Sequence, residues 1–287
     1  MAKVLERRPL NPTVTLLKVH APLIAKKAKA GQFVILRLDN MGERIPLTIA
    51  DFNPFEGTVT VILQKVGLTT QLLSLLRPGD EILDVVGPLG RPTDLEGIKR
   101  AVVVGGGVGN AIAYPQAKAL HRAGAYVDVI AGFRNRDIVI LEDELRAVCD
   151  NLYVTTDDGT YGEKGFVTDK LKALLDGGAQ YDVCIAIGPT PMMKFLCMTT
   201  KPYNLKTIVS LNPIMIDGTG MCGGCRVMVG GEQKFACVDG PDFDGHLVDF
   251  DSLINRNTLY RQQEADKLSD HVCRMLEASS ARLRRED

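Results

Sequence analysis

The sequence lacks several features that would point to particular functions. Its formal charge is −1, so there is no electrostatic reason to expect nucleic acid or an anionic membrane as a partner. No apolar run reaches the ~18 residues of a membrane-spanning helix, and the opening MAKVLERRPL lacks the apolar core of a signal peptide. The four histidines show no spacing typical of a catalytic site. We therefore expect a cytoplasmic protein that binds neither nucleic acid nor membrane.

Cysteine is better represented, with seven residues in a chain of 287. An odd number in a chain of this length does not suit a secreted disulfide framework, and it favours reduced thiols or metal ligands. Three cysteines lie close together in MCGGCRVMVGGEQKFAC, at positions 222, 225 and 237. The others are expected to pack as small apolar side chains: Cys149, Cys184, Cys197 and Cys273.

The pattern of apolar residues divides the chain into four parts. Residues 1–95 contain short, evenly spaced β-rich runs, which predict a small antiparallel barrel or sandwich. Residues 96–212 alternate buried strands with helical stretches, which predicts a parallel-sheet α/β domain. The cysteine segment covers 213–258, and 259–287 has helical spacing that indicates a tail helix packed on its own chain or, less favoured, bound to a partner.

A glycine-rich turn, AVVVGGGVGNAIAYP, opens the α/β domain. Glycines between a strand and a helix let the backbone approach a pyrophosphate, although an ordinary tight turn would show the same pattern. The acidic residue that usually ends the second strand is missing, and Arg134 in GFRNRD could bind a ribose or its 2′-phosphate, or be a solvated loop residue. NAD and NADP are therefore not distinguished. The candidate nucleotide-binding residues here are Gly105, Gly106, Gly107, Gly109, Asn110 and Arg134.

The stretch ERIPLTIADF carries Arg44, Pro46, Leu47 and Thr48. It resembles the R-x-P-[LFY]-[ST] signature of the ferredoxin–NADP reductase superfamily, in which an FAD-binding β-barrel precedes a pyridine-nucleotide domain. The resemblance implies that Arg44 binds the FAD pyrophosphate, which a guanidinium suits, and that the Thr48 hydroxyl reaches flavin N5, where hydride arrives. On this basis Arg44→Ala should weaken FAD retention and leave the iron content unchanged.

Further stretches resemble the same superfamily in the same order. LQKVGLTT is similar to the segment along the flavin ribityl and phosphates, GPLG at 87–90 to the turn closing the barrel, and IGPTPMM to the loop beside the nicotinamide. The resemblance spans almost the whole chain and implies a multi-domain β plus α/β fold. The further cofactor-binding residues it implies are Leu63, Gln64, Lys65, Thr69, Thr70, Gly188, Pro189 and Met192.

The cysteine segment resembles that of dihydroorotate dehydrogenase electron-transfer subunits, which hold a [2Fe–2S] cluster with C-x4-C-x2-C and a distant fourth cysteine. By this resemblance Cys222, Cys225 and Cys237 are ligands, and Asp217 stands where the first cysteine is expected. Zinc bound by the three thiolates with Asp217 or His246 is a less favoured alternative, and a lone C-x-x-C redox pair is less favoured still.

The aspartate, together with TTDDGTYGEKGFVTDKL, resembles the family of small subunits of NADH-dependent reduced ferredoxin:NADP⁺ oxidoreductases, also described as sulfide dehydrogenase beta subunits. That family implies an oxidoreductase subunit that exchanges hydride between NAD(H) and FAD. It passes single electrons through the cluster to a larger flavin/iron–sulfur subunit in a heterodimer, and indirectly to ferredoxin. The alternatives are a dihydroorotate dehydrogenase subunit, expected to keep cysteine at 217, and a zinc-stapled scaffold without flavin chemistry.

Overall fold

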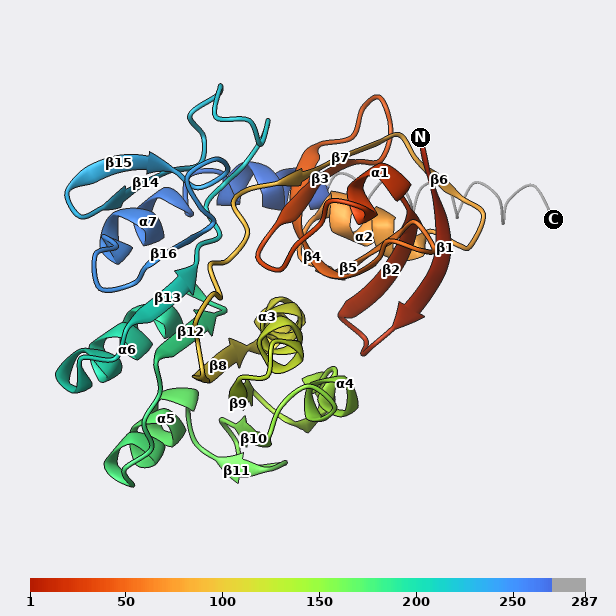
Figure 1. Ribbon diagram of the computed structural model, residues 1–287. Helices are drawn as coiled ribbons and strands as arrows, with labels where there is room; N and C mark the ends of the chain where they lie inside the picture. The colour runs from red at the N-terminus through yellow and green to blue at the C-terminus, as the bar shows by residue number, and fades with distance from the viewer. Residues whose placement is uncertain (270–287) are drawn as a thin grey trace.

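The computed structural model describes residues 1–269, beginning with a seven-stranded antiparallel sheet of order β6-β1-β2-β5-β4-β3-β7 (Figure 1). The edge strands β6 and β7 are separated in the chain by Leu83 alone, so the sheet curls into a nearly closed barrel. The elements are β1 (Ala2–Pro9), β2 (Val14–His20), α1 (Pro22–Ala25), β3 (Phe33–Arg37), β4 (Arg44–Asn53), β5 (Thr58–Gln64), α2 (Leu68–Leu75), β6 (Glu81–Ile82) and β7 (Asp84–Leu89).

The second sheet is mainly parallel, with the order β11-β10-β9-β8-β12-β13-β16. Its order reverses between β8 and β12, which is where open α/β sheets bind ligands. The elements are β8 (Arg100–Gly106), η1 (Gly107–Gly109), α3 (Asn110–Arg122), β9 (Tyr126–Phe133), η2 (Arg136–Ile138), α4 (Glu142–Arg146), β10 (Asn151–Thr156), β11 (Glu163–Lys164), α5 (Val167–Asp176), β12 (Val183–Ile187), α6 (Thr190–Thr200), η3 (Lys201–Tyr203) and β13 (Thr207–Ser210).

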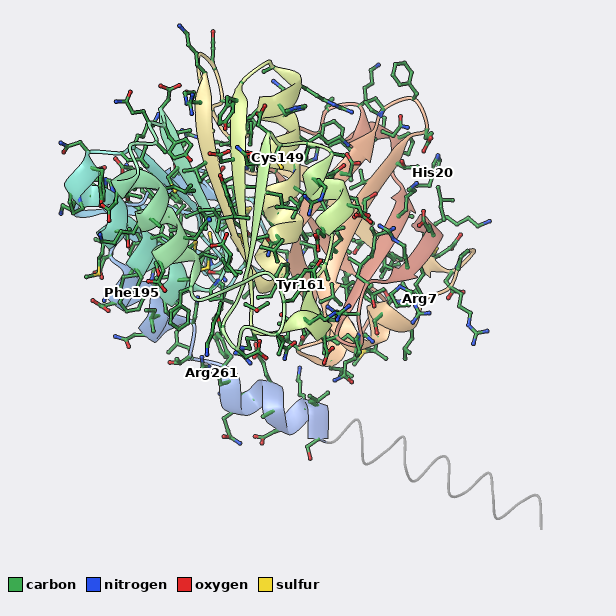
Figure 2. The ribbon with its side chains drawn as sticks, turned by 90° about the horizontal axis from the view of Figure 1, so that it is seen from below. Arg7, His20, Cys149, Tyr161, Phe195 and Arg261 are labelled. Atoms are coloured by element: carbon green, nitrogen blue, oxygen red, sulfur yellow. The ribbon has the colours of Figure 1, made fainter. Side chains whose placement is uncertain are left out.

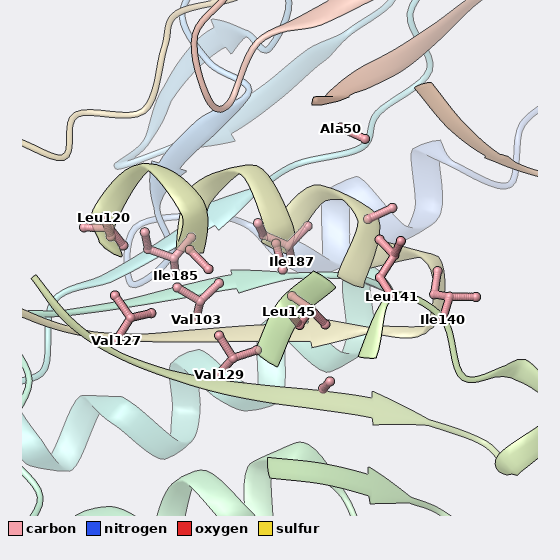
Figure 3. Close-up of a cluster of buried hydrophobic side chains, with 14 of the residues drawn as sticks. Ala50, Val103, Leu120, Val127, Val129, Ile140, Leu141, Leu145, Ile185 and Ile187 are labelled. Carbon is pink, nitrogen blue, oxygen red and sulfur yellow. The ribbon is translucent and has the colours of Figure 1, made fainter. Parts of the chain in front are cut away.

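Helices cover both faces of this sheet because its strands are apolar on both sides. Along β8, Ala101 and Val103 face a core that includes Leu120 of α3 and Leu145 of α4 (Figure 3). The alternate residues Val102 and Val104 face the opposite core, which α5, α6 and α7 complete. The barrel residues Val14, Leu16, Ala50 and Ile62 join the α3 core, so the two domains share one apolar interior.

The third part follows β13 and does not stand apart from the nucleotide domain. It contains the hairpin β14 (Arg226–Val229) and β15 (Glu232–Phe235), then β16 (Asp242–Asp244) and α7 (Phe250–Arg256). β16 pairs antiparallel with β13 and becomes the edge of the parallel sheet. Phe250 and Leu253 of α7 are buried in the core beneath α6.

Some local expectations differ from the structure. The stretch 137–149, expected to be helical, contains only the end of η2 and the short α4. Residues 261–269 are helical, as expected, but nearly all are exposed, and this helix projects from the body of the molecule at Arg261 (Figure 2). The remaining apolar positions of the expected tail helix lie outside the described residues, as does one cysteine: Val272, Met275, Leu276, Leu283 and Cys273.

The three parts meet at a partly buried polar cluster around Asp242 of β16. Its Oδ2 accepts hydrogen bonds from the hydroxyl of Thr93, in the linker after the barrel, and from Gln116 of α3 at 3.5 Å. Burial raises the pKa of Asp242, although hydrogen bonds from Thr93, Ser210 and Gln116 oppose the shift. A titratable group therefore lies at the junction of all three parts.

Asp242→Asn is expected to flatten the decline of thermal stability at rising pH. A raised carboxyl pKa means that the folded chain holds this proton more tightly than the unfolded chain. Stability therefore falls as pH rises from about 3.9 through the folded pKa. Between pH 4 and pH 8, the Tm of Asp242→Asn should fall by about 2–4 °C less than that of the parent chain. This difference corresponds to roughly 1 kcal/mol. Exposed Asp94→Asn is the control, and an unchanged slope in Asp242→Asn would contradict the assignment.

Candidate functional site

An opening in the barrel lies beside the first half of β4, which carries Arg44, Pro46, Leu47 and Thr48. β4 pairs with β5 only from Ile49 to Asn53, whereas residues 44–48 pair with β3 alone. The end of β5 likewise pairs there only with β2. Residues 44–48 are half-buried, and on the β5 side their backbone groups have no strand partner.

The end of β5 divides the predicted residues into inward and outward positions. Leu63 is buried in the barrel core, so only its backbone would be available to a cofactor. Gln64 is exposed, and the Nζ of Lys65 donates to the carbonyl of Pro12 at 2.8 Å. The Lys65 side chain is therefore bonded to the turn between β1 and β2. Its role towards a cofactor stays a prediction.

Helix α2 begins within the LQKVGLTT stretch, a few residues after the unpaired end of β5. The Thr70 hydroxyl accepts from the N–H groups of Val66 and Gly67, at 3.1 and 3.0 Å, and so fixes the start of the helix. Thr69 is buried, and its hydroxyl donates to Glu43 at 3.3 Å. The Glu43 carboxylate also accepts a hydrogen bond from the Lys267 ammonium group at 3.2 Å. The positive charge of Lys267 thus offsets the negative charge of Glu43, the residue next to Arg44.

The glycine turn is shaped by close packing and by one open position. A Cβ on Gly109 would lie 2.5 Å from the carbonyl oxygen of Ile187, and one on Gly106 would overlap Met192. Gly107 has φ +56 and open space where a Cβ would be, which suits a ligand lying over the turn. Asn110 is buried and donates to the carbonyl of Gly107 at 3.0 Å, fixing the turn before α3.

The predicted nicotinamide loop meets this turn because β8 and β12 are parallel neighbours. Gly105 lies opposite Ile187, and Gly188 is in close contact with Gly106. Pro189 is the N-cap of α6, whose first turn carries Met192. Arg134 follows β9 at the same edge and is exposed. The structure therefore brings together the predicted nucleotide residues, including Gly105 through its contact with Asn110.

The cysteine loop places the thiols of two predicted ligands side by side and bonds the Asp217 carboxylate to the backbone of Cys222. Cys225 and Cys237 are buried, and their Sγ atoms lie 3.1 Å apart. Asp217 accepts from the backbone N–H of Cys222 at 2.8 Å and from that of Thr219 at 2.9 Å. These bonds lower the pKa of Asp217, and the bond from Thr219 has the larger effect. Burial raises the pKa of Cys237 to about 12. A nearby cation would stabilise the Cys237 thiolate.

The zinc alternative has less support from this arrangement. Within residues 1–269, no three His, Cys, Asp or Glu side chains converge as they would around a single ion. His246 lies with its Nε2 3.0 Å from the Thr200 hydroxyl, a partner outside the cysteine loop. A two-iron cluster divides its ligands between two irons, so paired donors fit it better than a single ion.

The cysteine loop packs directly on the barrel. Phe33 and Ile35 of β3 share a buried cluster with Cys225 and Cys237. Phe33 is also the partner of Thr48 in the β3–β4 pairing. One cross-strand pair thus separates the edge of the barrel opening from the thiols. Sequence patterns did not single out Phe33, because an aromatic residue in a barrel strand is normally part of the core.

Comparison with known proteins decides the family. Residues 212–249 match the model of the iron–sulfur cluster binding domain of dihydroorotate dehydrogenase B. A Thermotoga maritima protein described as a dihydroorotate dehydrogenase B (NAD(+)) electron transfer subunit homolog is 51% identical over 246 residues, 86% of each chain. The electron transfer subunit from a Geobacillus species is 33% identical over 84% of this chain and 94% of its own. The chain belongs to the family of dihydroorotate dehydrogenase B electron-transfer subunits.

A solved structure of an NADH-dependent reduced ferredoxin–NADP oxidoreductase, described for flavin-based electron bifurcation, is also similar. It is 46% identical, with a TM-score of 0.90 over 95% of this chain and 98% of that chain. Together these findings confirm the predicted fold class, the FAD- and iron–sulfur-dependent type of oxidoreductase subunit, and FAD, [2Fe–2S] and NAD(H) as cofactors. Members of this family are subunits of larger assemblies. Within residues 1–269, no helix is both long and apolar enough to cross a membrane.

Proposed function

We propose that FAD lies along the barrel opening and NAD(H) on the glycine turn. Arg44 and the N-terminus of α2 would hold the FAD pyrophosphate, and Thr48 would face the reactive edge of the ring. The contact between β5 and η1 supports this arrangement, because it places the opening next to the nucleotide turn. When bound, the flavin supplies the exchange between hydride and single electrons, and the protein supplies position and charge.

We further propose that Asp217, Cys222, Cys225 and Cys237 hold the [2Fe–2S] cluster. The adjacent thiols of Cys225 and Cys237 would bind one iron, and Asp217 and Cys222, which a backbone hydrogen bond joins, would bind the other. An ionised carboxylate has about four lone-pair sites, so Asp217 can keep its two backbone bonds and still bind iron. Aspartate is ionised at neutral pH even at its ordinary pKa, and the pKa of Asp217 is lower still, because the backbone N–H of Thr219 donates to it.

The observation that carries the proposed function is the cross-strand pair Thr48–Phe33, with Phe33 packed in the same cluster as the cysteine thiols. It supports a subunit that takes hydride equivalents at a nucleotide site and delivers single electrons at its iron–sulfur loop. Of the two candidate functions, aspartate at 217 favours the NADH-dependent reduced ferredoxin–NADP oxidoreductase type over a dihydroorotate dehydrogenase subunit. The acceptor would then be a larger flavin/iron–sulfur subunit, with ferredoxin beyond it.

The test is anaerobic purification of the chain, followed by FAD, iron and sulfide analysis and titration with NADH and NADPH. The proposal expects one FAD and a two-iron cluster per chain, both reduced by NADH. A colourless chain that carries zinc would contradict it. Reconstitution with candidate large subunits, using dihydroorotate and reduced ferredoxin as alternative electron donors, separates the two candidate functions.

The surface around Cys222 is where we expect the partner subunit to dock. Cys222 is exposed, and Met221, Ile216 and Val238 beside it expose 87%, 50% and 38% of their surface. Met221→Glu should weaken assembly about tenfold or more, because it places a charge in a desolvated contact, without changing FAD or iron content. Phe55→Glu, on the exposed β4–β5 turn, is the control. Equal affinity of Met221→Glu and the parent chain in pull-down titrations would place the interface elsewhere.

A further inference from the structure

Arg44 makes a tertiary contact that the sequence did not suggest. Its Nε donates to the carbonyl of Ile216 at 3.0 Å, and its Nη2 to the carbonyl of Asp217 at 3.4 Å. The side chain thus reaches from the start of β4 to the loop that carries the predicted iron ligand. The expectation that Arg44 affects FAD alone therefore needs revision.

The geometry of a guanidinium allows a second ligand at the same time. Arginine offers five N–H donors in a planar fork, and the Nε and Nη2 edge is the one turned to the two carbonyls. The edge formed by Nη1 and Nη2 keeps donors for a phosphate. One side chain can therefore bind a pyrophosphate and the iron–sulfur loop together.

The contact continues by hydrogen bonds to a cysteine. Arg44 binds the backbone carbonyl of Asp217, whose carboxylate accepts from the N–H of Cys222 at 2.8 Å. The next residue, Gly218, is pressed against the barrel, since a Cβ there would lie 2.8 Å from Leu89. The loop is therefore held on the barrel by two neighbouring contacts. One is the polar contact with Arg44, and the other is the apolar contact between Gly218 and Leu89.

We propose that Arg44 is a positioning residue for the iron–sulfur loop, and that it couples occupation of the FAD phosphate site to the geometry of Asp217 and Cys222. The inference rests on the proposed function, because it takes the opening beside β4 as the FAD site. A phosphate on the free edge fixes the guanidinium plane, and the fixed plane sets the positions of the two carbonyls. Lysine keeps the charge but cannot bind both carbonyls and a phosphate from one plane.

The experiment compares Arg44→Lys with Arg37→Lys in the full chain, at saturating FAD. Arg37 is the ideal control, because it lies directly opposite Arg44 in the β3–β4 pairing and binds the carbonyl of Asn40 and Asp84 instead. We expect Arg44→Lys to change the electron paramagnetic resonance spectrum and the midpoint potential of the reduced cluster. Iron loss to a chelator should become about tenfold faster. Arg37→Lys should match the parent chain.

A second measurement needs no variant. Reversible removal of FAD from the parent chain should alter the cluster spectrum, and adding FAD back should restore it. An Arg44→Lys chain whose cluster spectrum, potential and iron loss equal those of the parent would overturn the inference, as would a parent cluster insensitive to FAD. A parent chain that binds no FAD or no cluster would instead refute the proposed function, so the two failures are distinguishable.

Discussion

Asp217→Ala is expected to lose most of its iron while keeping FAD. The substitution removes the proposed oxygen ligand and also the acceptor for the N–H groups of Thr219 and Cys222. Asp217→Asn separates these effects, because its side-chain oxygen can keep the turn while the charge is lost. Asp217→Cys should retain a cluster with a changed spectrum, since it restores four thiolates. Iron and sulfide analysis with visible and electron paramagnetic resonance spectra measures each outcome.

Asp158→Ala provides a matched control for the turn. Asp158 accepts from the N–H of Thr160 at 2.9 Å, the same local bond that Asp217 makes to Thr219, but in the nucleotide domain. We expect this variant to keep its full iron content. If Asp217→Asn also kept a fully occupied and spectrally unchanged cluster, Asp217 would be a turn-forming residue and the ligand assignment would fail.

Gly109→Ala is expected to lower NADH-dependent reduction roughly a hundredfold, the scale of a displacement of about 1 Å at a reacting centre. Its Cβ would lie 2.5 Å from the carbonyl oxygen of Ile187 and 2.8 Å from the Cα of Gly188. Both are backbone atoms and cannot turn away, so the glycine turn and the loop after β12 must separate. Stopped-flow reduction by NADH measures the effect, and reduction by dithionite should be unchanged.

Gly177→Ala tests whether any added methyl group has the same effect. Gly177 is the C-cap of α5, with a φ of −74° that other residues can also adopt, and its Cβ would lie 3.2 Å from the carbonyl oxygen of Ala173. We expect near-normal reduction by NADH in this variant. Normal NADH kinetics in Gly109→Ala would show that hydride transfer does not depend on the contact between the two loops.

The family signatures predicted the architecture because they are local patterns with local causes. The run around Val103 predicted a strand buried on both faces, and Gly107 and Gly109 predicted the turn after it. Asp217 was singled out as a candidate ligand, which stays a prediction, because it occupies a position where relatives are expected to have cysteine. Each of these features can be recognised within a short window of sequence.

The contacts between the parts could not be predicted in this way. Arg44 and Ile216 are far apart in the chain, and nothing near Arg44 indicates that a carbonyl is its partner. Helix α2 was missed because its N-cap is a glycine without a side chain, so Thr70 provides the capping bond from inside the helix. β16 has too few residues for a pattern and forms only because β13 offers an edge.

The origin of β16 has a consequence for biosynthesis. Asp242–Asp244 is translated after Cys237, so every proposed ligand has left the ribosome before the outer edge of β13 can be covered. Until that moment β13 displays unpaired backbone donors and acceptors, which a neighbouring nascent chain could extend into an aggregate. A chain terminated just before Pro241 would carry a complete set of thiols on an unfinished nucleotide module, and should be recovered as insoluble material.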